Sequence, residues 1–138
     1  MRLFPSLIIG AALIGASASA LAADRDNSKN EAKLTAALAG RVAGKPVSCI
    51  NLRDVRSSQI IDDTAIVYDT GGGRLFVNRP RIGAESLDND DILVTKTYGS
   101  ELCSLDTIKL IDRGSQMQRG FVGLGEFVPY AKVKVANP

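Results

Sequence analysis

The stretch that most constrains the fold is Thr64–Asn78, which reads TAIVYDTGGGRLFVN. Two apolar runs, Thr64–Tyr68 and Leu75–Val77, flank a turn with three consecutive glycines. Val, Ile, Tyr and Phe suit the pleated surface of a strand, and glycine adopts the positive φ values of a tight reversal. The stretch therefore predicts a β-hairpin with a loop of about four to five residues. Because both faces of Thr64–Tyr68 are apolar, we expect this strand in the middle of a sheet that is covered on both sides.

Residues 1–23 have the order of a secretory signal peptide. Arg2 precedes an uncharged apolar run over Leu7–Ala16, and the Ala-Leu-Ala at 20–22 offers small residues before a cleavage point. The run is shorter than the roughly 20 apolar residues of a membrane-spanning helix. We therefore expect cleavage after Ala22 or Ala23, a periplasmic or secreted mature protein, and no membrane span after the signal is removed.

The expected mature chain has about 115 residues, the size of a single domain. Without Arg2 it carries 16 basic against 15 acidic side chains, so its charge gives no reason to expect nucleic acid as a partner. The chain has no histidine, which excludes Ser-His-Asp and Cys-His catalysis and histidine-ligated metal sites. We expect neither a cofactor nor a metal.

The segment before residue 41 predicts one short helix. Asp24–Asn30 is polar, and we expect it to be a disordered mature N-terminus. Ser28 and Glu31 match the capping box, in which a serine caps a helix and a glutamate three residues later reaches back. Leu34 and Leu38 then share one helix face, so the pattern predicts a helix over Lys29–Ala39 that ends before Gly40.

From Arg41 onward the pattern is that of strands. Besides the hairpin, β-prone runs occur at Val47–Leu52, Gln59–Ile61, Ile92–Tyr98, Thr107–Ile111 and Phe121–Val128, the last with a bulge or bend at its glycines. Residues 131–135 alternate with lysines and follow Pro129, which predicts a protected edge strand. The sequence thus predicts an α+β protein: residues 24–40 form a polar N-terminus and short helix, and residues 41–138 form one small, mostly antiparallel β-domain, a sandwich or a partly closed barrel.

Cys49 and Cys103 are the only cysteines. In an oxidising compartment such a pair forms a disulfide, here closing a loop of about 55 residues. The chain lacks the Cys-x-x-Cys pair of a disulfide exchanger, so we expect a structural bridge.

The triplet Asp69-Thr70-Gly71 resembles the short motif of aspartic peptidases, in which two aspartates share a proton and activate water. A chain with one such triplet would have to act as a homodimer, like the retroviral-type enzymes, with Asp69 in the catalytic pair. Tyr68 and Gly72 depart from the residues usual in that motif. The alternative is that Asp69 and Gly71 are ordinary hairpin-turn residues.

Three other groups of residues could bind ions. The Gly71–Gly73 run would need a following helix to present N–H groups to phosphate, and a strand is predicted there instead. Asp88–Asp91 could bind Ca²⁺, but it lacks the spacing of an EF-hand and reads more simply as a solvated acidic loop. Five arginines could form an anion-binding patch or a mixed charged surface: Arg53, Arg56, Arg74, Arg79 and Arg81.

The layout of the chain resembles a family of small exported proteobacterial proteins that carry a domain of unknown function. The resemblance covers about residues 44–130 and rests on a Cys-Ile in the first strand, the Asp-rich hairpin, Leu102–Asp106 and the closing GLGEFVPY at 123–130. It implies export and a β-rich architecture, and it implies no reaction. We therefore expect a non-enzymatic periplasmic binding or envelope-accessory module, whose partner is an envelope or periplasmic protein or a small ligand. The dimeric aspartic peptidase remains the alternative.

Overall fold

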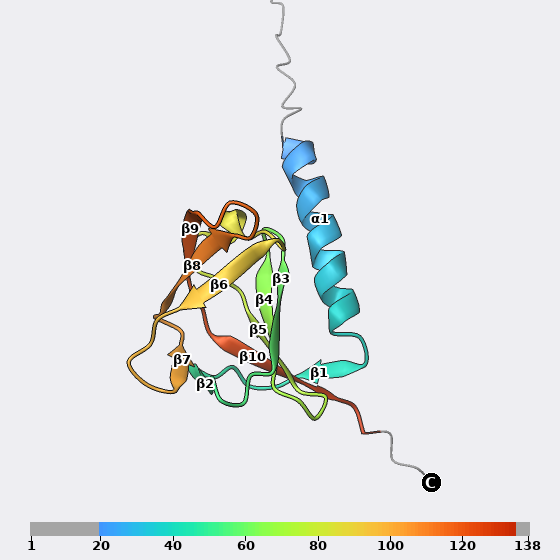
Figure 1. Cartoon of the computed structure of the whole chain (residues 1–138). Helices are drawn as coiled ribbons and strands as arrows, with labels where there is room; N and C mark the ends of the chain where they lie inside the picture. The colour runs from blue at the N-terminus through green and yellow to red at the C-terminus, as the bar shows by residue number, and fades with distance from the viewer. Residues whose placement is uncertain (1–19, 135–138) are drawn as a thin grey trace, which may run out of the picture.

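The computed structural model describes residues 20–134, which form one α-helix, ten strands and a short 3-10 helix, η1 (Ala84–Ser86). The α-helix, α1 (Ala20–Ala37), lies beside a compact body of strands (Figure 1). The predicted signal peptide lies outside the described residues except for its last four, which begin α1. Within residues 20–134 no helix is long and apolar enough to cross a membrane.

The strands form three open sheets, and every strand pair is antiparallel. The largest sheet has the order β1 (Arg41–Ala43), β10 (Phe127–Lys132), β5 (Leu75–Asn78), β4 (Ala65–Asp69), β3 (Ser57–Ile61). The other two sheets consist of β2 (Cys49–Asn51) with β7 (Glu101–Cys103), and of β6 (Asp91–Thr95), β8 (Thr107–Asp112) and β9 (Gln118–Gly123). The predicted α+β class, with one helix and mostly antiparallel strands, is confirmed in a sandwich-like arrangement.

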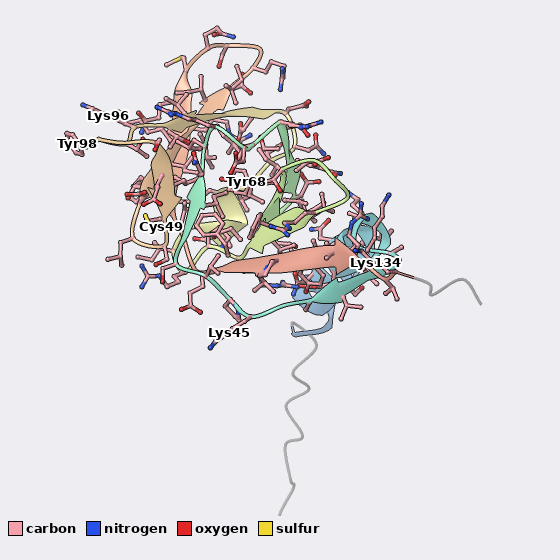
Figure 2. All side chains as sticks on the ribbon, turned by 90° about the horizontal axis from the view of Figure 1, so that it is seen from below. Lys45, Cys49, Tyr68, Lys96, Tyr98 and Lys134 are labelled. Atoms are coloured by element: carbon pink, nitrogen blue, oxygen red, sulfur yellow. A yellow bond between two sulfur atoms is a disulfide. The ribbon has the colours of Figure 1, made fainter. Side chains whose placement is uncertain are left out.

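The central hairpin is β4 and β5, as predicted. β4 lies between β3 and β5, and Ala65–Tyr68 are all buried. Ala65 and Val67 pack with Leu34 of α1, whereas Ile66 and Tyr68 belong to the core shared with the other sheets. Figure 2 shows Tyr68 inside the body and Tyr98 projecting from it. The three loop glycines have φ values of 79°, 64° and 78°, so the reversal uses the conformational freedom that only glycine has without strain.

The helix differs from its prediction at both ends. It begins at Ala20 rather than Lys29 and ends at Ala37 rather than Ala39, so Asp24–Asn30 is helical and the capping-box prediction is wrong. The physical reason is the alanine content of the segment ALAADRDNSKNEAKLTAA, because alanine has the highest helix propensity and the helix can continue upstream of Ser28. Glu31 instead binds Arg79.

The predicted edge strand over 131–135 is also wrong. Ala131 and Lys132 end β10, residues 133 and 134 are outside any strand, and residue 135 lies beyond the described part. The edge of this sheet next to β10 is β1, which was not predicted. Pro129 lies inside the paired strand β10, and its carbonyl oxygen accepts a hydrogen bond from Gly44 N at 2.7 Å. Its nitrogen, which carries no hydrogen, faces the same side, at the point where the chain leaves β1. The proline is therefore tolerated in this strand.

The predicted break in Phe121–Val128 is a gap between two strands, since β9 ends at Gly123 and β10 begins at Phe127. Asn78, which is fully buried, stabilises this gap: its Nδ2 donates to Gly125 O at 2.7 Å and its Oδ1 accepts from Gly125 N at 3.0 Å. A side chain at position 125 would collide with the carbonyl oxygen of Arg79, so this crossing requires glycine.

The disulfide between Cys49 and Cys103 is present, with an S–S distance of 2.11 Å. The two residues lie directly opposite each other in β2 and β7, a strand that was not predicted. Ile50 and Leu102, the next pair in register, are buried in the main core. The bridge therefore fastens this small sheet to the rest of the body, and it fits an oxidising compartment.

Candidate functional site

Asp69, the residue of the peptidase alternative, ends β4. Its Oδ1 accepts a hydrogen bond from Gly71 N at 2.7 Å, which is the local bond of an Asx turn. Arg74 N donates to Gly71 O at 3.1 Å and closes the loop. In this chain the carboxylate thus shapes the hairpin turn. A catalytic pair would need a second copy to bring in the other aspartate.

The five candidate arginines divide into two groups. Arg79 binds Glu31 of α1 through two hydrogen bonds of 2.6 and 2.9 Å, and this contact holds the pKa of the glutamate below its ordinary value. Arg81 donates to the carbonyls of Leu124 and Ser104 at 3.0 and 2.9 Å. Both side chains therefore hold the fold together. Arg53, Arg56 and Arg74 line a separate cavity of about 390 Å³.

The acidic loop is less solvated than predicted, because Asp91 begins β6 and is only 3% exposed. Arg119 lies 3.4 Å from Oδ1 of Asp91 and 3.2 Å from Oδ2 of Asp88. Neither Asp91 oxygen has a hydrogen-bond partner in the described part, and its burial raises the pKa of the carboxyl, with Arg119 partly opposing this. A guanidinium thus occupies the place between Asp88 and Asp91 where a cation would be expected.

The cysteines raise the question of a metal site, since their sulfurs and the carboxylate of Glu101 lie within 4.8 Å of one another. This is the only group with metal-ligand spacing among residues 20–134. Metals bind the thiolate form, and both sulfurs are held in the disulfide. The cluster therefore offers a single carboxylate to an ion.

A cavity of about 770 Å³ lies between β3 and β6. One wall is formed by Ser58–Ile61 and the other by Asp91–Leu93, with Lys33, Asp62, Asn89 and Arg113 completing the lining. Both strands are the terminal strands of their sheets. The cavity is therefore a groove between two strand edges, which we call the edge groove.

One end of the edge groove is closed by hydrogen bonds. The turn after β3 is tied to the segment that enters β6: Asp63 N donates to Leu87 O at 3.1 Å, and Asn89 N donates to Oδ1 of Asp62 at 2.7 Å. Lys33 of α1 adds an ion pair with Asp62 at 3.4 Å. From this closed end β6 runs away from the turn (Figure 1).

Backbone groups of β3 face the groove. Ile61 O accepts from Thr64 N inside the β3–β4 hairpin, so Ile61 faces β4. Because hydrogen-bonding direction alternates along a strand, the backbone N–H and C=O groups of Ser58 and Ile60 face the groove.

The same reasoning applies to β6. Asp112 N donates to Met117 O and Asp112 O accepts from Gln116 N, so Asp112 faces β9. Its register partner Asp91 therefore faces away from β8, where its N–H donates to Asp88 O at 3.0 Å. Two residues later the backbone N–H and C=O of Leu93 also point away from β8 and toward the groove.

Exposed strand edges are usually protected by proline, lysine, a bulge or an inward charge. Pro46 follows β1 after two further residues, and a register irregularity interrupts the pairing of β9 with β8. β3 (Ser57–Ile61) has none of these features, and β6 has one inward charge, Asp91. Compared with β1 and β9, the two edges that border the edge groove thus carry less protection.

Comparison with protein-family models, with curated proteins and with solved structures finds no match to this chain. The function is therefore inferred from the geometry of the chain itself.

Proposed function

We propose that this chain is an exported, non-enzymatic binding module that accepts an extended segment of a partner polypeptide as an added strand in the edge groove. One observation carries the proposal: two strand edges with outward-facing backbone groups border the same cavity of about 770 Å³. A polypeptide is the ligand whose N–H and C=O groups repeat at the spacing of a strand. Since β3 and β6 each have five residues, at about 3.3 Å per residue, the ligand segment is about five residues long.

The compartment in this proposal is the periplasm or the exterior. The signal-peptide pattern of residues 1–23, the resemblance to small exported proteobacterial proteins and the Cys49–Cys103 bridge all support it. The ligand is accordingly a segment of an envelope or periplasmic protein.

Selection of displayed random peptides on the purified, disulfide-bonded protein tests the function. We expect selected peptides to slow hydrogen exchange at the amides of Ser58, Ile60 and Leu93, because these N–H groups face the groove and become bonded on strand addition. Failure to select any peptide, or protection confined to other amides, would refute the proposal.

Ser58→Pro provides a sharper test with a matched control. Proline removes the one N–H that Ser58 directs into the groove and leaves the β3–β4 hydrogen bonds in place, because residues 57, 59 and 61 make those bonds. We expect peptide binding to weaken about tenfold or more, on the scale of a lost backbone bond plus a steric mismatch. Ser58→Ala keeps the N–H and should bind as the parent does. Equal binding by both variants would contradict strand addition.

The peptidase alternative is tested separately. Cleavage of a protein substrate at acid pH that is inhibited by pepstatin and lost in Asp69→Asn, while retained in Asp63→Asn, would replace the binding-module proposal with a dimeric aspartic peptidase. Asp63 is the matched control because it is an exposed aspartate in the neighbouring hairpin turn.

A further inference from the structure

The arginines with described side chains differ in whether their guanidinium groups are paired. Arg41 donates to Gly73 O at 3.1 Å, and Arg79, Arg81 and Arg119 have the partners described above. By contrast, Arg53, Arg56 and Arg74 are exposed and have no side-chain hydrogen bond or ion pair within the described part of the chain. These three unpaired groups share the lining of the 390 Å³ cavity, whereas Arg113, which is likewise exposed and without a side-chain partner in the described part, lines the edge groove.

Two loops hold the three arginines in place. In the β2–β3 loop, Asp54 N donates to Asn51 O at 3.1 Å and Val55 N donates to Leu52 O at 3.3 Å. Leu52 and Val55 pack on the main core, and the disulfide fastens β2. The loop that displays Arg53 and Arg56 is therefore fixed before any ligand arrives, which lowers the entropic cost of binding.

The second loop is the glycine turn. Arg56 N donates to Asp69 O at 2.7 Å and joins the two loops, while Thr70 N donates to Arg74 O at 3.2 Å. A Cβ at Gly71 would lie only 2.5 Å from Nε of Arg56, so the arginine lies directly over bare backbone. Gly72 has open space at the same position and also lines the cavity. Gly72 thus leaves its backbone uncovered beside the arginines, as in sites that bind anions, whereas the Gly71 N–H already donates to Asp69 Oδ1.

The charge of the cavity defines its ligand. Three arginines face one lining carboxylate, Asp54, so the cavity has an excess of positive charge. Guanidinium forms paired hydrogen bonds with the oxygens of phosphate, and three of them exceed what a single carboxylate can accept. No aromatic side chain lines the cavity, so it has no surface on which a nucleobase could stack.

From this arrangement we propose that Arg53, Arg56 and Arg74, with the turn at Gly71–Gly72, form a binding site for phosphate or pyrophosphate groups on a non-aromatic ligand. The site shares no lining residue with the edge groove. Its ligand can be a soluble phosphate compound or the headgroup of a phospholipid, since both present the same oxyanion.

Titration with pyrophosphate at low ionic strength, followed by amide chemical shifts, tests the site. We expect saturable shifts at Arg53, Gly71, Gly72 and Arg74 that weaken with added salt. The variant Arg53→Gln/Arg74→Gln should weaken binding about tenfold or more, because charge-assisted bonds to two guanidinium groups are lost.

The control Lys45→Gln/Lys109→Gln removes the same charge from two lysines that do not line the cavity, and it should bind within about twofold of the parent, as a screened charge outside the cavity allows. Absence of saturable shifts at millimolar pyrophosphate, or equal weakening by the two double variants, would overturn the proposal.

Vesicles identify the source of the phosphate. If the protein sediments with phosphatidic acid vesicles but not with phosphatidylcholine vesicles, and pyrophosphate releases it, the site binds lipid phosphate. If it binds pyrophosphate and ignores both kinds of vesicle, the site binds a soluble phosphate compound. Either outcome supports the site.

Discussion

The Cys49–Cys103 bridge should supply a large share of the stability of the fold. It joins residues separated by 54 positions, and the chain-entropy relation for a loop of this length gives about 4 kcal/mol at 25 °C. Ordinary domains have a total unfolding free energy of about 5–15 kcal/mol. We therefore expect Cys49→Ala/Cys103→Ala to lower the unfolding free energy by about 4 kcal/mol, and the Tm by about 15 °C for a domain of this size.

Urea denaturation of the oxidised protein, the reduced protein and the double-alanine variant measures this contribution. The reduced protein and the variant should agree with each other, and both should show a larger m value, because the unfolded chain without the bridge exposes more surface. The variant serves as its own control, since adding reductant to it should change nothing. A loss below about 1 kcal/mol in both forms would refute the entropy argument and would indicate an unfolded state that stays compact without the bridge.

Three further substitutions have definite expected signs. Leu34→Ala should cost about 2–5 kcal/mol in urea denaturation, because Leu34 is 2% exposed between α1 and the sheet, whereas Lys29→Ala on the exposed face should cost less than about 0.5 kcal/mol. Tyr68→Phe should leave the Tm unchanged or raise it, because the buried hydroxyl, whose pKa burial raises, has no hydrogen-bond partner in the described part. Burial raises the pKa of Asp91 above its ordinary 3.8, so the folded state binds this proton more tightly than the unfolded state does. The free energy of unfolding therefore falls as the pH rises from 3.8 through the raised pKa. Asp91→Asn should therefore raise the Tm at neutral pH and leave it unchanged well below pH 3.8; a lower Tm at neutral pH would show that the Arg119 pairing outweighs burial.

The parts of the fold that could be predicted depend on residues close together in sequence. The β4–β5 hairpin follows from two apolar runs around a run of glycines, and the two-sided burial of Ala65–Tyr68 follows from the mainly apolar side chains on both faces of this strand. The disulfide could be predicted because two cysteines have one possible pairing.

The missed elements depend on distant partners. β1 and β7 have three residues each and are strands only because β10 and β2 lie beside them. The N-terminal extension of α1 was missed because a good capping pattern at Ser28–Glu31 coincides with a sequence that also favours helix upstream.

The two proposed sites show the same contrast. The edge groove depends on which strands end their sheets, and no local pattern in Ser57–Ile61 indicates that this strand lacks a second neighbour. The sequence shows the five arginines, but which of them are paired depends on long-range contacts, such as that of Arg79 with Glu31, 48 positions apart. The unpaired members could be recognised only after those contacts were known.

The proposed sites are neighbours along the chain at the start of β3, which leads to a final prediction. Arg56 lines the arginine cavity and Ser58 lines the edge groove, and two residues along an extended chain span about 7 Å. A strand added beside β3 that extends past Ser57 therefore reaches the unpaired guanidinium groups. Because a carboxylate placed there gains charge-assisted bonds, peptides selected by the groove should carry an acidic residue at this end.

Arg56→Gln should abolish that preference while the variant still binds peptides, and Lys45→Gln should preserve it, since Lys45 lines neither cavity. Saturating pyrophosphate should weaken the acidic peptides about as much as replacing their acidic residue with alanine does, because both ligands compete for the same arginines. The same peptides should in turn weaken pyrophosphate binding, as the reciprocity of coupled binding requires. Selected peptides without an acidic bias, or peptide affinity that pyrophosphate does not change, would show that the edge groove and the arginine cavity act separately.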